Sequence, residues 1–134
     1  MKKIVLMLII LAIAVGIIIV CRSGKSNNRN NKVHTITAEE AYHMMQEGNT
    51  VIVDVRRQDE YNSGHIRNAI LIPDESITDR EPEALSDKDS VILVYCRSGN
   101  RSRKAAGKLA RMGYKNIYDF GGIRSWPYEI TEEQ

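Results

Sequence analysis

Three stretches of the chain are almost continuously apolar and rich in β-branched residues: residues 50–55, 69–72 and 91–95. Strands that are covered on both faces have this composition, and such strands are typical of parallel sheets. Residues 116–120 are predicted to add a last strand, which ends where Gly121 and Gly122 interrupt the pattern. The pattern therefore predicts several short, buried, parallel strands.

Two other segments repeat their apolar residues with helical spacing. The first follows Thr37 and Glu40, which match the capping-box pattern of a helix N-terminus, and it stops at Gly48. The second covers residues 102–112, whose alanine and leucine side chains share one face. Because helices alternate with strands, the sequence predicts one compact α/β domain with a central, mainly parallel sheet flanked by helices.

The chain begins with an uncharged, apolar run over residues 4–21, preceded by Lys2 and Lys3. This run is longer than the apolar core of a secretory signal, about 7–15 residues, and close to the roughly 17–25 residues that span a bilayer. Residues 1–21 are therefore predicted to be a signal-anchor or transmembrane segment. Cleavage and lipid attachment at Cys21 are alternatives, the latter disfavoured by the bulky Val20.

Residues 22–32 are rich in Asn, Ser and basic residues and are predicted to form a flexible basic linker to a domain at residues 33–134. Basic residues flank the apolar run on both sides, so their effects on its orientation nearly cancel. The pattern resembles a bacterial export signal, which favours a membrane-anchored domain on the extracytoplasmic side. The domain itself is expected to be a monomer.

Charge and cysteine content exclude several classes of function. Residues 33–134 contain 13 Lys and Arg against 17 Asp and Glu, so no broad basic surface for nucleic acid is expected. Cys96 is the one cysteine of the domain, and the other, Cys21, lies in the apolar run. An internal disulfide in the domain is therefore excluded, and the spacing does not fit a structural zinc site.

Cys96 stands where a predicted strand gives way to a helix, a position at which open α/β sheets bind ligands. Backbone N–H groups at the helix start, together with nearby arginines, favour a bound anion and a reactive thiolate. A buried, inert thiol is the alternative. The sequence predicts an anion cradle with Cys96 as nucleophile, lined by Arg97, Ser98, Gly99, Asn100, Arg101 and Ser102.

Residues 96–102 read Cys-x-x-Gly-x-Arg-Ser, the motif that rhodanese-like sulfurtransferases carry at the head of a helix. The chain resembles this family from about residue 35 to residue 126, in the family's order and spacing. The other matching positions are Asp54-Val55-Arg56, Glu60-Tyr61, Gly64-His65-Ile66, Ala69, Pro73, Gly113-Tyr114, Gly121-Gly122-Ile123 and Trp126.

The resemblance implies a rhodanese-like, three-layer fold and a sulfurtransferase activity. Cys96 would take sulfane sulfur from an anionic donor such as thiosulfate, hold it as a persulfide, and pass it to a thiol or cyanide-like acceptor. The rest of the loop would bind substrate, without a metal or an organic cofactor. Two alternatives remain open: a noncatalytic sulfur-carrier or sensing module, and a cysteine phosphatase or arsenate-reductase-like enzyme.

Loop length bears on the last alternative. Similar phosphatases place seven residues from Cys through Arg, whereas Cys96 to Arg101 is six residues, which favours sulfur transfer. Asp54 and Arg56 are expected to form structural ion pairs, the latter with Glu60. His65 is expected to be structural.

Overall fold

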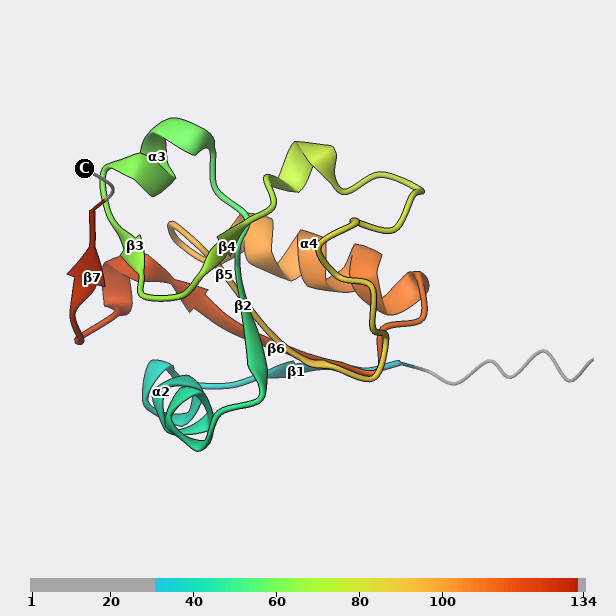
Figure 1. The fold of residues 1–134 in the computed structure, drawn as a ribbon, viewed down its shortest axis with the longest axis horizontal. Helices are drawn as coiled ribbons and strands as arrows, with labels where there is room; N and C mark the ends of the chain where they lie inside the picture. Colours follow the sequence, from blue (N-terminus) through green and yellow to red (C-terminus); the bar gives the residue numbers. More distant parts are fainter. Residues whose placement is uncertain (1–30, 133–134) are drawn as a thin grey trace, which may run out of the picture.

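The computed structural model of the protein describes residues 31–132 (Figure 1). Three helices, seven strands and two short 3₁₀ turns make up this part of the chain. In chain order they are β1 (Val33–Thr35), α2 (Ala38–Glu47), β2 (Thr50–Asp54), α3 (Gln58–Asn62), β3 (His65–Ile66), β4 (Ile70–Leu71), η1 (Asp74–Ser76), β5 (Val91–Cys96), α4 (Asn100–Arg111), β6 (Asn116–Gly122), η2 (Ile123–Ser125) and β7 (Ile130–Thr131).

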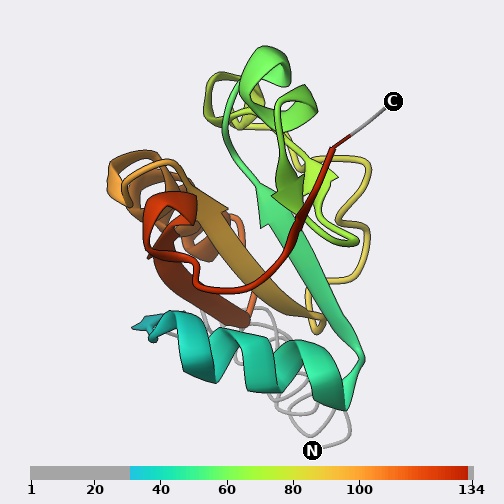
Figure 2. The same ribbon diagram turned by 90° about the vertical axis from the view of Figure 1, so that its left-hand side faces the viewer.

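Five strands form a fully parallel sheet in the order β1-β6-β5-β2-β4. The apolar runs became β2 and β5, which lie next to each other at the centre, where both faces are covered. Helix α4 covers one face and α2 the other, as the two views together show (Figures 1 and 2). This arrangement confirms the predicted α/β fold with a parallel sheet between helices.

Side chains on the two faces of β5 belong to two separate hydrophobic clusters. Ile92 and Val94 point toward the α4 side and pack with Leu109, whereas Leu93 and Tyr95 point toward the α2 side. Cys96 belongs to the α4 side, because side chains alternate along a strand. The strand therefore brings the Cys96 sulfur to the carboxyl end of the central strands, just before the start of α4.

Helix α2 begins as the capping box predicts. The Glu40 N–H donates to Thr37 Oγ1 at 3.1 Å, and the Thr37 N–H donates to Glu40 Oε2 at 2.7 Å. Such reciprocal bonds satisfy backbone donors that have no partner inside the helix. The helix ends before Gly48, where the sequence places its stop.

Several boundaries differ from the prediction. Helix α4 begins at Asn100, two residues before the predicted start, because Gly99 takes the N-cap position. Strand β6 continues through Gly122 instead of stopping at Phe120, with an irregular register beside Cys96. The predicted strand over residues 69–72 is shorter, Ile70–Leu71. Short elements such as β3 and β7 carry too few residues to show a period, so the pattern did not predict them.

The predicted apolar anchor and most of the basic linker lie outside the described residues. Within residues 31–132, no helix has the length and apolar character needed to cross a membrane.

Candidate active site

Cys96 is the last residue of β5, and the loop that follows leads directly into α4; residues 96–102 are called the Cys96 loop below. Only 1% of Cys96 is exposed, whereas Arg97, Ser98 and Asn100 are exposed around it. The thiol therefore lies at the base of the loop, and the loop backbone forms the rim.

Hydrogen bonds converge on the Cys96 sulfur. The Gly99 N–H donates to Sγ at 3.0 Å, and Ser102 Oγ lies 3.7 Å from Sγ. Burial acts to raise the pKa of the Cys96 thiol, but hydrogen bonds from the Ser102 backbone and hydroxyl, and from the Gly99 and Ser98 N–H groups, outweigh it and lower the pKa. The loop thus stabilises the thiolate, the nucleophilic form of cysteine.

Two glycines allow the loop to take this shape. Gly99 has a φ of +104°, a region that side chains rarely adopt, and a Cβ there would meet Gly121 Cα at 3.4 Å. Gly122, on β6, is packed so closely that a Cβ would lie 2.2 Å from the Arg97 carbonyl oxygen. That carbonyl accepts a hydrogen bond from the Arg124 N–H at 3.3 Å. The end of β6 therefore supports the loop from below.

Arg101 forms a salt bridge with Glu60, for which the sequence analysis predicted a different partner. Its guanidinium donates twice to Glu60, at 2.7 and 2.8 Å, and the side chains are 28% and 15% exposed. The Arg101 hydrogen bonds lower the pKa of Glu60 to about 2. The predicted pairing of Arg56 with Glu60 is therefore wrong. Arg97, by contrast, is an exposed loop side chain.

Asp54 and Arg56 have the structural, ion-paired role that was predicted, but they pair with each other. Arg56 donates to both carboxylate oxygens of Asp54, with the shortest contact at 2.7 Å, and it also donates to the Gly64 carbonyl at 2.7 Å. The Tyr95 hydroxyl donates to Asp54 at 2.6 Å. This buried network fixes the end of β2 next to the end of β5, so it acts as scaffold for the loop.

The remaining predictions concern structural residues. His65 is buried, stacks on Tyr61 at 3.7 Å between ring centroids, and lies 3.0 Å from the Tyr61 carbonyl through Nδ1. Trp126 packs in the α2-side cluster. Both side chains fill space, which is the structural role expected for His65. Asp119 lies inside the strand predicted over residues 116–120, and no motif pointed to it, yet its carboxylate lies 2.7 Å from Ser102 Oγ, beside the loop.

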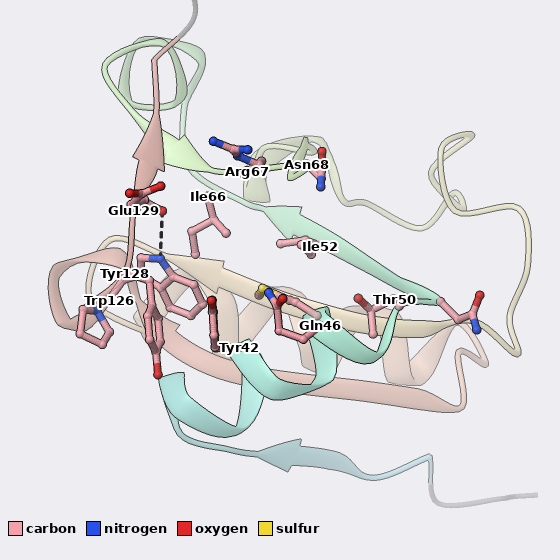
Figure 3. Close-up of a pocket in the computed structure, with 14 residues that line it drawn as sticks. Tyr42, Gln46, Thr50, Ile52, Ile66, Arg67, Asn68, Trp126, Tyr128 and Glu129 are labelled. Carbon is pink, nitrogen blue, oxygen red and sulfur yellow. Dashed lines mark hydrogen bonds between the residues drawn. The ribbon is translucent and has the colours of Figure 1, made fainter.

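A cavity of about 790 Å³ opens on the α2 side of the sheet (Figure 3). Residues of α2, the start of β2 and the segment around Trp126 and Tyr128 line it, and no residue of the Cys96 loop does. The cavity is therefore separate from the thiol. Within residues 31–132, no three His, Cys, Asp or Glu side chains are grouped closely enough to hold a metal ion.

A family sequence model, the Rhodanese-like domain, matches residues 37–128. The chain belongs to the rhodanese-like domain family. The rhodanese-related protein of Thermoplasma volcanium is 31% identical and superposes with a TM-score of 0.65, over 75% of this chain and 99% of that one. A rhodanese from E. coli, solved with anions, is 30% identical with a TM-score of 0.58, over 63% of this chain and 99% of the other.

The chain also resembles part of longer proteins. The tRNA uridine(34) hydroxylase of Yersinia pestis is 32% identical over 105 residues, which cover 75% of this chain and 30% of that protein. The chain thus spans about a third of the length of the curated relatives it matches. The family match therefore identifies the domain and leaves its reaction open.

Proposed function

We propose that the protein is a rhodanese-type sulfurtransferase that carries sulfane sulfur as a persulfide on Cys96. The observation that carries this proposal is the cradle of backbone donors on the sulfur, led by the Gly99 N–H at 3.0 Å. Fixed donors that stabilise a thiolate also stabilise the persulfide anion formed from it. The donor is a small anion such as thiosulfate, and the acceptor is a thiol or a cyanide-like nucleophile.

The size and charge of the loop support a small anionic donor. Six residues run from Cys96 to Arg101, and the Arg101 guanidinium is turned to Glu60, which neutralises much of its charge. A phosphate ester needs several donors around three oxygens, whereas a sulfane sulfur needs room for one atom. Arg97, Ser98, Gly99, Asn100 and Ser102 contribute to substrate binding mainly through the loop backbone. A related rhodanese from E. coli was solved with anions, the charge class that we propose for the donor.

A second candidate is a sulfur carrier or sensor that passes sulfur to a partner protein with little turnover of its own. The nearly complete burial of Cys96, 1% exposed, favours it, because a covered sulfur is slow to meet free donors and acceptors. Both candidates use the same persulfide, and they differ in the rate of repeated cycles.

The site operates on a domain tethered to a membrane by residues 1–21, through the linker at residues 22–32. The apolar run of this segment is long enough to span a bilayer. The domain faces the extracytoplasmic side in this proposal. A reporter fused to the C-terminus tests this placement, because its signal shows on which side of the membrane the domain lies.

Turnover distinguishes the candidates. The full-length chain with Cys21→Ser, purified in mild detergent, is given thiosulfate and cyanide, and thiocyanate is measured over time. Repeated cycles that vanish in Cys96→Ser support the enzyme. A single stoichiometric transfer supports the carrier. Hydrolysis of a phosphate ester that depends on Cys96, without thiocyanate, would replace both with a phosphatase.

A further inference from the structure

The buried hydroxyl of Ser102 lies between the Cys96 sulfur and the buried carboxylate of Asp119. Ser102 Oγ lies 3.7 Å from Cys96 Sγ and 2.7 Å from Asp119 Oδ1. Ser102 is fully buried, and only 4% of Asp119 is exposed. The Gly121 N–H donates to the same Asp119 oxygen at 3.0 Å, so this carboxylate is oriented toward the serine.

The hydroxyl of Ser102 has one proton to donate and two lone pairs that accept. Its shortest contact is to the Asp119 carboxylate, whereas the carbonyl oxygens of Gly99 and Gly121 lie farther away, at 3.1 and 3.3 Å. With the proton directed at Asp119, a lone pair is left to accept the S–H of Cys96. Hydrogen bonds therefore run in one direction, from thiol to hydroxyl to carboxylate.

The same three groups are satisfied with every bond reversed. If the carboxyl carries the proton, it donates to Ser102 Oγ, and Ser102 donates to a Cys96 thiolate. Each arrangement contains the same two protons and one negative charge, and neither leaves a donor or an acceptor unpaired. Cys96 is 1% exposed, and this internal route requires no water molecule at the sulfur.

We propose that Asp119 takes the proton of Cys96 through the Ser102 hydroxyl, so that the thiolate forms without solvent reaching the sulfur. Ser102 and Asp119 are then positioning and proton-holding residues for the nucleophile. The geometry alone carries this inference, and its place in a sulfur-transfer cycle rests on the proposed function.

The step balances in atoms and electrons. The Cys96 S–H bond breaks as a new O–H bond forms on Ser102; the original Ser102 O–H bond breaks as an O–H bond forms on Asp119. The electron pair of the S–H bond stays on Sγ. With thiosulfate, that pair forms a bond to the outer sulfur, the S–S bond of thiosulfate breaks, and sulfite leaves with its electrons. Cys96 then holds the persulfide anion.

Two salt bridges lie close to the loop. On α4 and α3, Arg101 is paired with Glu60, whose pKa is lowered to about 2. On β2, Asp54 is paired with Arg56, and Tyr95 of β5 donates to Asp54.

One histidine lies near Asp119 in the sheet. On β1, His34 stacks on Tyr118, at 5.1 Å between centroids. Tyr118 precedes Asp119 on β6 and therefore points to the opposite face. The replacement His34→Gln should leave the pH profile of Cys96 unchanged.

The test measures the rate at which iodoacetamide alkylates Cys96 from about pH 5 to pH 9, in the full chain with Cys21→Ser. Wild type should show a rate that flattens on the acid side, because internal transfer maintains a fixed thiolate fraction. Asp119→Asn and Ser102→Ala should lose this plateau and fall about tenfold per pH unit, ending at least tenfold below wild type near pH 5. Above the thiol titration all three should agree within about threefold. Ser102→Thr keeps the hydroxyl and should keep the plateau.

Three outcomes would overturn the relay. Wild type itself could lack the plateau, a result that needs no variant to fold. Asp119→Asn could react faster at every pH, which would make Asp119 only a repelling charge. Both variants could melt at lower temperature yet keep the wild-type profile, which would make the pair purely structural. Alkylation requires no sulfur donor, so a failure of thiosulfate to load Cys96 would refute the proposed function and leave this test unaffected.

Discussion

The support of the Cys96 loop by Gly122 is open to a single-atom test. In Gly122→Ala, the new Cβ would lie 2.2 Å from the Arg97 carbonyl oxygen and 2.7 Å from Ser98 Cα. Ordinary contact begins near 3.4 Å, so the loop must move by about 1.2 Å. Both contacts are to backbone, so no flexible side chain can turn away to relieve them.

The cost follows from that displacement. Overpacking typically costs about 1–3 kcal/mol, and loss of the Arg124-to-Arg97 hydrogen bond adds about 1 kcal/mol. We expect the free energy of unfolding to fall by about 2–4 kcal/mol. A misplacement of this size also costs a catalytic group on the order of 100-fold in rate. Urea denaturation measures the first quantity, and the alkylation rate of Cys96 at neutral pH measures the second.

Gly107→Ala is the matched control. Gly107 lies within α4, and the nearest atom to its new Cβ is the flexible end of Arg111, at 3.6 Å. Alanine favours a helix over glycine by about 0.5–1 kcal/mol, so this variant should be at least as stable as wild type and equally reactive. If Gly122→Ala retained wild-type stability within about 0.5 kcal/mol and wild-type reactivity, the supporting role of β6 would be refuted.

Three further predictions concern charge and the membrane. Glu60→Gln should lower the unfolding free energy by about 1.5–3 kcal/mol at neutral pH. This loss should shrink as pH falls from about 5 toward 2 in denaturation series, because the Arg101 hydrogen bonds lower the pKa of Glu60 to about 2. The control Asp59→Asn, in an exposed ion pair, should change the unfolding free energy little, and a pH-independent effect of Glu60→Gln would contradict a stabilising Glu60–Arg101 ion pair. Because hydrogen bonds outweigh burial and lower the pKa of Cys96, the thiolate should add stability that rises with pH to about 8.5 and is lost as pH falls through the lowered pKa. Wild type and Cys96→Ser should therefore diverge in urea unfolding as pH rises, and parallel curves would argue against a stabilised thiolate. The full chain should sediment with membranes and a chain beginning at Val33 should not; equal sedimentation would contradict an anchor at residues 4–21.

Local pattern was sufficient for the parts of the fold that depend on local physics. The apolar runs that became β2 and β5 could be assigned to a parallel sheet because both of their faces are buried. The capping box at Thr37 located the start of α2 to the residue. The position of Cys96 between a strand and a helix located the loop, because a strand-to-helix turn exposes backbone N–H groups by its geometry alone.

The parts that the sequence did not predict are contacts between residues far apart along the chain. Arg101 meets Glu60 across 41 positions, whereas the pattern offered Arg56 as a nearer partner. Asp119 lies in a strand-like segment, and its carboxylate reaches Ser102 only because β6 pairs with β5 in the folded domain. A buried charge in the middle of an apolar strand was the available signal, since such charges are rarely buried without a partner.

The central claim is that Cys96 carries sulfur, and a single incubation tests it most directly. The full-length chain with Cys21→Ser is mixed with thiosulfate, and the mass of the Cys96 peptide is measured before and after addition of cyanide. If the claim holds, Cys96 gains one sulfur atom, cyanide removes that atom as thiocyanate, and Cys96→Ser shows no gain. An unmodified Cys96 peptide, or the same gain in both proteins, would contradict it.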